Sequence, residues 1–279
     1  MSVSTTNALV TTDWLADRLA QPGLVVAEVD ENPDLYEEGH IPGAVKLHWK
    51  DDLQDPLVRD VASKAAFERL MSERGIGNDT TVVLYGDKNN WFAAYAYWYL
   101  KVYRHEDVRL LDGGRQKWIE EGRELTVAPA APTPLGYIAK DRDESIRIRR
   151  DEVLTGLADP GVALVDVRSP QEFAGELVAP PGYEQEGASR TGHIPGAQSI
   201  PWATAVRDDG TFKSTEELQE IYTVKGITPD KEIRAYCRIG ERSAHTWFVL
   251  RELLGYENVR NYDGSWTEWG NLVDVPIER

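Results

Sequence analysis

The single cysteine of this 279-residue chain, Cys237, lies in the segment YCRIGERS over residues 236–243. The residue pattern predicts a short buried strand over 232–236 and a helix over 245–254 with its apolar residues on one face. A cysteine between a strand and a helix N-terminus lies near the positive end of the helix dipole, and two arginines stand beside it. Both effects favour the thiolate, which is the form that attacks an electrophile. The segment therefore predicts a nucleophile rather than a buried structural thiol.

The spacing between Cys237 and Arg242 is C-x4-R. Successive backbone N–H groups in such a turn converge on an anion. Cysteine-dependent phosphatases use a similar turn with one residue more, usually with histidine before the cysteine, where this chain has Tyr236. A smaller ring suits a single sulfur atom on the cysteine better than a phosphoryl group. The spacing therefore favours sulfur transfer over phosphatase or arsenate reductase chemistry.

This loop resembles the active-site loop of the rhodanese family, the thiosulfate:cyanide sulfurtransferases, and most closely that of the two-domain actinobacterial thiosulfate sulfurtransferases, which have the same CRIGERS character. Other segments typical of the family are GHIPGA at 192–197, DVR at 166–168 and YDGSW at 262–266, so the resemblance covers nearly the whole chain. It implies that Cys237 carries a persulfide. It also implies that the rest of the loop binds the substrate, namely Arg238, Ile239, Gly240, Glu241, Arg242 and Ser243.

The basic residue directly after the cysteine, Arg238, resembles the thiosulfate-using branch of that family, since the 3-mercaptopyruvate branch more often has glycine there. Thiosulfate is a small dianion and gains from two charge-assisted contacts. Vertebrate-type members carry a substrate-binding arginine where this chain has Glu172. We therefore expect this anion contact to come from Arg242 or Arg190, or to be absent. Glu241 is expected to point to solvent or to pair with Arg190 or Arg238.

An internal repeat predicts two similar domains. An offset of 151 residues pairs Tyr85 with Tyr236 and Trp118 with Trp269, and an offset of 153 pairs the two HIPGA segments, at 40–44 and 193–197. Ordered matches over so long a period indicate a duplicated domain rather than a solenoid.

Each half is expected to form an α/β domain, a mainly parallel sheet with helices on both faces, because strands and helices alternate along it. The expected strands include 24–29 and 162–167, which end at the acidic residues Asp30 and Asp166, and the expected helices include 12–20, 63–74, 149–157 and 215–225. Ligands bind beyond the carboxyl ends of such strands, where Cys237 falls. The expected domains are 1–125 and 147–279, with a proline-containing linker over 126–146.

The two halves differ at the candidate nucleophile, because the position that matches Cys237 is Gly86. The N-terminal domain is therefore expected to be catalytically silent, and its aromatic run over 91–99 to serve core and interdomain packing. The second half carries an insertion over 175–192, which is either a solvated surface loop or a flap that brings Arg190 to the active site.

Three histidines could assist a cysteine, but each has a simpler structural interpretation. His40 and His193 lie in the HIPGA segments, where a histidine usually closes the turn by hydrogen bonding, and His245 lies on the expected helix after the loop. Asp166 and Arg168 are expected to form an ion pair at the end of their strand. We therefore expect none of them to act as the base for Cys237.

The composition excludes several classes of partner. The net charge is −16, which argues against nucleic acid and anionic membrane surfaces. No apolar run approaches the roughly 20 residues of a membrane span.

A single cysteine fits a reducing compartment, and residues 1–10 lack the pattern of a secretory signal, so a cytoplasmic location is expected. No metal-ligand spacing and no nucleotide-binding fingerprint is present, so we expect no metal and no organic cofactor.

The sequence thus predicts a thiosulfate sulfurtransferase that takes the outer sulfur of thiosulfate onto Cys237 and passes it to cyanide or a thiol. The acceptor must be external, because the chain has no second cysteine. The alternatives are a 3-mercaptopyruvate sulfurtransferase and a persulfide carrier for a protein acceptor. The sequence leaves the oligomeric state open.

Overall fold

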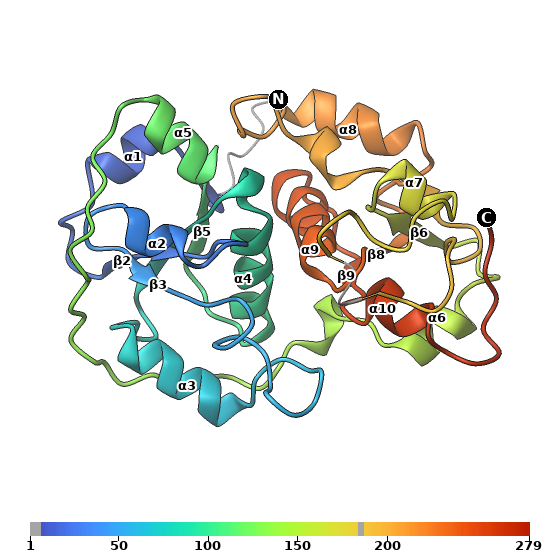
Figure 1. The fold of residues 1–279 in the computed structure, drawn as a ribbon, viewed down its shortest axis with the longest axis horizontal. Coiled ribbons are helices and arrows are strands. Elements are labelled where there is room, and N and C mark those ends of the chain that lie inside the picture. The colour runs from blue at the N-terminus through green and yellow to red at the C-terminus, as the bar shows by residue number, and fades with distance from the viewer. Residues whose placement is uncertain (1–6, 184–186) are drawn as a thin grey trace. The chain divides into compact units, whose positions relative to one another are not determined.

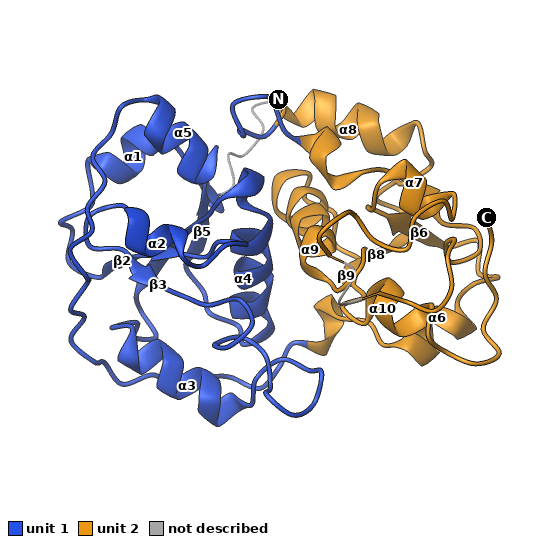
Figure 2. Cartoon of the chain, in the orientation of Figure 1, with its two compact units in different colours: residues 1–143, 206–212 blue, residues 144–205, 213–279 orange. Residues whose placement is uncertain are grey.

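The computed structural model describes residues 7–183 and 187–279, which form two compact units (Figures 1 and 2). Unit 1 comprises residues 1–143 and 206–212, and unit 2 comprises residues 144–205 and 213–279. Each unit has its own parallel sheet with helices around it, which confirms the expected α/β fold. The domain boundaries drawn from the sequence stay predictions.

The sheet of unit 1 has five parallel strands in the order β1-β5-β4-β2-β3. These are β1 (Leu9–Val10), β2 (Leu24–Glu28), β3 (Val45–Lys46), β4 (Thr81–Tyr85) and β5 (Val108–Leu111). The helices of the unit are α1 (Thr12–Ala16), α2 (Leu35–Glu38), α3 (Lys64–Glu73), α4 (Trp91–Val102) and α5 (Gly114–Glu120), with a short 3₁₀ segment η1 (Lys88–Asn90).

The sheet of unit 2 has four parallel strands in the order β7-β6-β8-β9. These are β6 (Val162–Asp166), β7 (Gln198–Ser199), β8 (Glu232–Tyr236) and β9 (Val259–Asn261). The helices are α6 (Arg150–Thr155), α7 (Pro170–Phe173), α8 (Thr215–Thr223), α9 (Glu241–Phe248) and α10 (Ser265–Trp269). The described residues also form the shorter segments η2 (Glu144–Ile146), η4 (Trp202–Ala205) and η5 (Val249–Leu253), the last of which continues α9 as a π-helix.

Local sequence explains why these elements form. The central strands β6 and β8 are mostly buried along their length, as parallel strands covered on both faces must be. Helix α8 begins at a capping box in which Ser214 and Glu217 bond each other's backbone N–H groups, and it buries Leu218 and Tyr222 one turn apart. Trp266 and Trp269 lie in the core of unit 2.

Two helix boundaries differ from the expectation by four residues, and the other differences, with η5 taken as the continuation of α9, are of one or two residues. The first helix ends at Ala16 rather than residue 20, because residues 17–20 form turns. Helix α9 begins at Glu241, four residues before the expected start, because the loop after Cys237 turns directly into the helix at Gly240.

The match between the acidic residues at the strand ends of the two halves needs one correction. Asp166 pairs with Tyr236 across β6 and β8, and the residue that pairs with Tyr85 in the same way is Glu28. Glu28, rather than Asp30, is therefore the counterpart of Asp166. The sequence could not decide this, since both acidic residues follow the same apolar run.

The aromatic run on α4 is largely buried. Within unit 1, the Tyr99 ring lies 5.6 Å from the Phe67 ring and 5.7 Å from the Tyr103 ring, measured between centroids. This confirms that the run forms part of a core, while its expected part in interdomain packing stays a prediction. In the described part of the chain, no helix is both long and apolar enough to cross a bilayer.

A short arm from the second half of the chain belongs to unit 1. It spans 206–212 and is closed by an antiparallel bridge between Val206 and Phe212. The Phe212 N–H donates to Asp112 Oδ1 over 2.9 Å, and Lys117 Nζ lies 3.1 Å from Asp209 Oδ2. The arm thus packs on the turn between β5 and α5, which no repeat in the sequence indicated.

Candidate active site

The candidate nucleophile lies at the carboxyl edge of the unit 2 sheet, directly after β8. Cys237 has 0% of its surface exposed, and its Sγ accepts a hydrogen bond from the Gly240 N–H over 3.1 Å. A backbone N–H aimed at sulfur stabilises a charge that develops there. The loop therefore presents a buried sulfur to a backbone donor, and the role of Cys237 as nucleophile stays a prediction.

Gly240 is the residue that allows the loop to close so tightly. It caps α9 with φ of 109°, and a Cβ at this position would lie 2.9 Å from both Cα and Cβ of Asp263. Asp263 cannot easily move aside, because Arg147 donates to its carboxylate over 2.9 and 2.7 Å. Only glycine fits here, for reasons of both conformation and space.

Replacing Gly240 by alanine is therefore expected to destabilise unit 2 and to move the Gly240 N–H away from Cys237 Sγ. The unfavourable φ costs about 1–3 kcal/mol, and the contact with Asp263 adds overpacking of about 1–3 kcal/mol. Gly196→Ala is a matched control, since Gly196 has φ of 76° but open space around its Cβ position. Urea unfolding should show the larger loss for Gly240→Ala, and equal losses would contradict the role given to Asp263.

The β9–α10 turn fixes the backbone of the loop from the other side. The Cys237 N–H donates to Ser265 Oγ over 3.1 Å, while the Trp266 and Thr267 N–H groups donate to the carbonyls of Cys237 and Arg238 over 3.0 and 2.9 Å. Ser265 Oγ also lies 4.0 Å from Cys237 Sγ. Sequence reasoning had not singled out Ser265, although it belongs to the YDGSW segment.

Ser243 and Asn261 position Gly240. Ser243 Oγ lies 3.0 Å from the Gly240 carbonyl oxygen and 2.7 Å from Asn261 Oδ1, and Asn261 Nδ2 donates to the same carbonyl over 3.1 Å. Both side chains are buried, as is Ile239. The predicted contacts of Ser243 and Ile239 with substrate stay predictions.

The 175–192 insertion reaches the loop through Tyr183. Arg238 Nη1 donates to the Tyr183 carbonyl over 2.7 Å, and the guanidinium lies 5.0 Å from the centre of the Tyr183 ring. A cation over an aromatic face is favourable. This contact supports the interpretation of the insertion as a flap, of which residues 184–186 lie outside the described residues.

Arg190 contributes to the site through its backbone. Its carbonyl accepts the indole N–H of Trp266 over 3.0 Å, and its exposed guanidinium lies 3.2 Å from the Ser189 carbonyl. Its proposed contact with the substrate stays a prediction.

Glu241 is buried, so the expectation that it points to solvent is wrong. Only 4% of its surface is exposed, and Oε2 lies 4.0 Å from Cys237 Sγ. The early start of α9 makes Glu241 the first residue of the helix, where the dipole favours a carboxylate.

Arg242 forms a buried ion pair with Glu172. Its Nη1 and Nη2 donate to the two carboxylate oxygens, each over 3.0 Å. Burial opposes the charge of Glu172, but the bonds and charge of Arg242 outweigh it and hold the pKa of Glu172 below its ordinary value. Burial likewise opposes the charge of Arg242, yet Glu172 and then Cys237 raise the pKa of Arg242. Glu172 thus binds the arginine that the sequence assigned to the donor.

The model of the rhodanese-like domain matches residues 11–121 and 149–272. The chain belongs to the rhodanese family. The matched segments fall in both halves, which agrees with the internal repeat.

Curated relatives of this rhodanese align over nearly their whole lengths. The sulfur carrier protein TtuD of Thermus thermophilus is 60% identical over 97% of this chain and 96% of its own. A Saccharopolyspora erythraea protein with the provisional name thiosulfate sulfurtransferase is 58% identical over 99% of this chain and 98% of its own.

Solved structures agree with this fold. The anaerobic ergothioneine biosynthesis enzyme of Chlorobium limicola, in complex with trimethyl histidine, is 28% identical with a TM-score of 0.84, and the match covers 98% of this chain and 70% of that one. Wild-type EanB gives 28% identity and a TM-score of 0.85 over 98% of this chain and 69% of that one.

The end of β6, beside the Cys237 loop, is stabilised by an ion pair. Arg168 Nη2 lies 2.6 Å from Asp166 Oδ2, and the Arg168 guanidinium lies 4.5 Å from the centre of a Trp266 ring. Tyr236 Oη accepts the Ile194 N–H over 3.0 Å. The predicted ion pair is thus confirmed.

The histidines of this rhodanese have structural contacts. His40 Nδ1 lies 2.7 Å from the Tyr36 carbonyl, and His193 Nδ1 lies 2.9 Å from the Phe173 carbonyl, which confirms that both close their turns. Burial lowers the pKa of His245 to about 3, so it is neutral at ordinary pH.

The matching loop of unit 1 leaves no room for a nucleophile. A Cβ at Gly86 would lie 2.1 Å from the carbonyl oxygen of Val29. The Gly86 N–H donates to Asn90 Oδ1 over 2.9 Å, so the loop closes through a side-chain amide. This geometry supports the expectation that the N-terminal rhodanese-like domain is silent.

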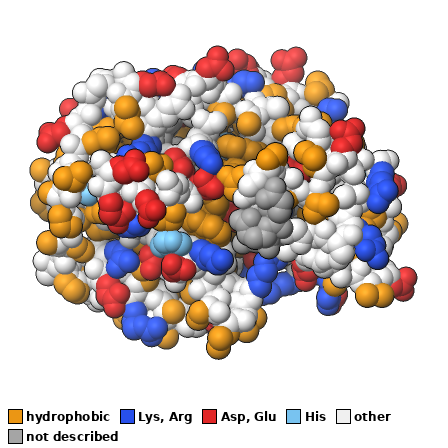
Figure 3. All heavy atoms as spheres, in the orientation of Figure 1, with side chains coloured by type: hydrophobic (Ala, Val, Ile, Leu, Met, Phe, Trp, Pro, Cys, Tyr) orange, Lys and Arg blue, Asp and Glu red, His pale blue; other side chains and the backbone are white. Residues whose placement is uncertain are grey.

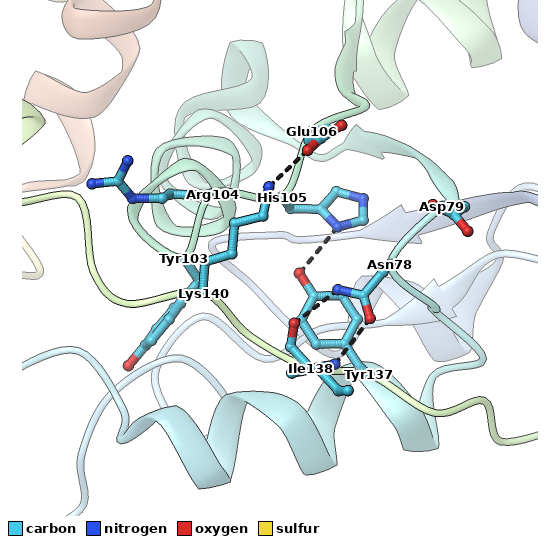
Figure 4. Close-up of a pocket in the computed structure, with 9 residues that line it drawn as sticks. All are labelled: Asn78, Asp79, Tyr103, Arg104, His105, Glu106, Tyr137, Ile138 and Lys140. Atoms are coloured by element: carbon cyan, nitrogen blue, oxygen red, sulfur yellow. Dashed lines mark hydrogen bonds and ion pairs between the residues drawn. The ribbon is translucent and has the colours of Figure 1, made fainter.

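A small pocket on unit 1 offers no alternative site (Figure 4). Several of its polar groups bond one another, the backbone or charged side chains outside the pocket. His105 lies between Tyr137 Oη at 3.1 Å and the Thr80 carbonyl at 2.8 Å, and Lys140 Nζ lies 2.7 Å from Glu106 Oε1. The residues that line it are Asn78, Asp79, Tyr103, Arg104, His105, Glu106, Tyr137, Ile138 and Lys140.

On the face shown in Figure 3, acidic and basic side chains alternate with apolar ones. Within residues 7–183 and 187–279, no group of three or more His, Cys, Asp or Glu side chains is arranged to hold a metal ion.

Proposed function

We propose that this rhodanese is a thiosulfate sulfurtransferase that works through a persulfide on Cys237. The observation that carries the proposal is the Gly240 N–H, which donates to Cys237 Sγ over 3.1 Å. The Cys237 thiolate attacks the outer sulfur of thiosulfate and forms a new S–S bond. The old S–S bond breaks, and sulfite leaves with its electron pair.

The second half of the reaction restores the thiolate. Cyanide or an external thiol attacks the outer sulfur of the persulfide, and the bond to Cys237 breaks with its electrons on sulfur. Backbone N–H groups stabilise the terminal sulfur between the two steps. Arg238 and Arg242 are proposed to receive the anionic donor, with Arg190 at the rim. A cytoplasmic location, where thiols are abundant, stays part of this proposal.

A persulfide carrier for a protein acceptor is the second candidate. The Thermus thermophilus relative, at 60% identity, is named a sulfur carrier protein. The two functions share the Cys237 persulfide and differ only in what removes the sulfur. A carrier would take up one sulfur atom and release it only to its protein partner. An enzyme would transfer sulfur repeatedly to small acceptors.

The proposal is tested by the intact mass of the protein after incubation with thiosulfate, and separately with 3-mercaptopyruvate, each followed by cyanide. We expect a gain of one sulfur atom at Cys237 from thiosulfate and its loss to cyanide, with one thiocyanate released per cycle and many cycles per protein.

Other outcomes of this experiment separate the alternatives. Sulfur gain from 3-mercaptopyruvate alone would overturn the thiosulfate assignment and keep the mechanism. Loading without repeated turnover would favour the carrier. No gain from either donor would contradict the persulfide itself.

A further inference from the structure

The Glu172 carboxylate lies deep in unit 2 and accepts three hydrogen bonds. None of the surface of Glu172 is exposed. Arg242 supplies two of the bonds at 3.0 Å, and the Ser169 N–H supplies the third to Oε2, also at 3.0 Å. The third bond belongs to the capping box at the start of α7, which fixes the orientation of the Glu172 side chain. Glu172 is therefore a fixed negative charge on Arg242.

Three charged side chains of the loop, together with the Glu172 carboxylate that bonds one of them, have formal charges that sum to zero. Arg238 and Arg242 are positive, while Glu172 and Glu241 are negative, and all four are buried. A loop with two free arginines would attract a dianion strongly. Because Glu172 already neutralises one arginine, the second negative charge of a dianionic donor gains less here.

We propose that Glu172 sets the charge preference of the site: by pairing with Arg242 it lowers the affinity for dianionic sulfur donors relative to monoanionic ones. This inference rests on the proposed sulfurtransferase function. Glu172 is a positioning residue, because it acts on the donor through Arg242. Loss of its charge should help a donor with two negative charges more than a donor with one, since the freed cation interacts with each charge.

Thiosulfate and methanethiosulfonate form a matched pair of donors. Both carry an outer sulfur on a sulfonyl sulfur, and a methyl group in the second replaces one oxygen of the first. In each case the Cys237 thiolate bonds the outer sulfur and the S–S bond breaks. Sulfite leaves from thiosulfate, and methanesulfinate leaves from methanethiosulfonate. The two donors therefore differ chiefly by one unit of charge.

Glu172→Gln is the test variant, because the amide oxygen can still accept the Ser169 N–H. The ratio of kcat/KM for thiosulfate to kcat/KM for methanethiosulfonate is expected to rise about tenfold, mainly through a lower KM for thiosulfate, which corresponds to about 1.4 kcal/mol. Glu217→Gln is the matched control. Glu217 is exposed and caps Ser214 in the same way on α8, so this variant loses the same charge and should keep the wild-type ratio.

A binding measurement separates this inference from the proposed function. In a Cys237→Ser background, calorimetric titration with thiosulfate should show tighter binding when Glu172→Gln is added. Unchanged binding and an unchanged ratio would overturn the inference while leaving sulfur transfer intact. If Glu172→Gln tightens thiosulfate binding but the wild-type protein never forms a persulfide, the inference about charge holds and the proposed sulfurtransferase function is overturned.

The wild-type protein provides a check that does not depend on the folding of the variant. It is expected to show a KM for methanethiosulfonate that is no higher than its KM for thiosulfate. A KM several-fold lower for thiosulfate would mean that the dianion is already preferred, which would contradict the role given to Glu172.

Discussion

Sulfur transfer should fall by roughly 1,000-fold or more when Cys237 is replaced by serine, which is the scale of loss when an enzyme loses its nucleophile. A serine hydroxyl at the same place cannot form a persulfide. The measurements are the rate of thiocyanate formation from thiosulfate and cyanide, and the intact mass after thiosulfate alone. Transfer that survives this substitution would contradict the proposed mechanism.

Cys237→Ala is the companion variant, because it separates chemistry from packing. Serine keeps an acceptor for the Gly240 N–H, whereas alanine leaves that buried donor without the sulfur it now bonds. An unsatisfied buried donor costs about 1–3 kcal/mol. Both variants should be inactive, but only Cys237→Ala should lose this stability in urea. Equal stability of the two would mean that the N–H contributes little to the fold.

Replacing Arg242 by methionine should destabilise unit 2 by about 3–5 kcal/mol, because it leaves the Glu172 carboxylate buried without its cation. The pair is buried on both sides, and the carboxylate has no exposed surface. The urea transition of this unit should move to lower concentration, and sulfur uptake from thiosulfate should fall with it. A stability within about 1 kcal/mol of wild type would show that the pair contributes no more than a surface ion pair does.

The double variant Arg242→Met with Glu172→Met should recover much of that stability, since removal of both charges avoids the uncompensated carboxylate. It should not recover thiosulfate activity, because the cation is gone. Arg149→Met is a control for the loss of an arginine alone, because Arg149 and Glu144 form an exposed pair at 3.8 Å. A double variant no more stable than the single one would contradict this account of the pair.

Local spacing alone singled out the candidate nucleophile. The strand, Cys237 and the glycine that closes the loop follow one another within a few residues. Their relative positions therefore depend on local backbone geometry, which the sequence pattern indicates. The parallel sheets and the two HIPGA turns were predictable for the same reason, since apolar strands and turn residues recur at fixed intervals in both halves. The position that matches the nucleophile, Gly86, also follows from the repeat.

The partners of these residues depend on contacts between distant segments, and the tertiary structure alone decided them. Glu172 meets Arg242 because the sheet brings the ends of β6 and β8 to one edge, and Ser265 meets Cys237 because β9 lies beside β8. The sequence contains several acidic residues near each strand end, and nothing in their spacing says which one is buried against which arginine. Burial and pairing are properties of the packed chain, so the charge balance at the nucleophile became visible only in the fold.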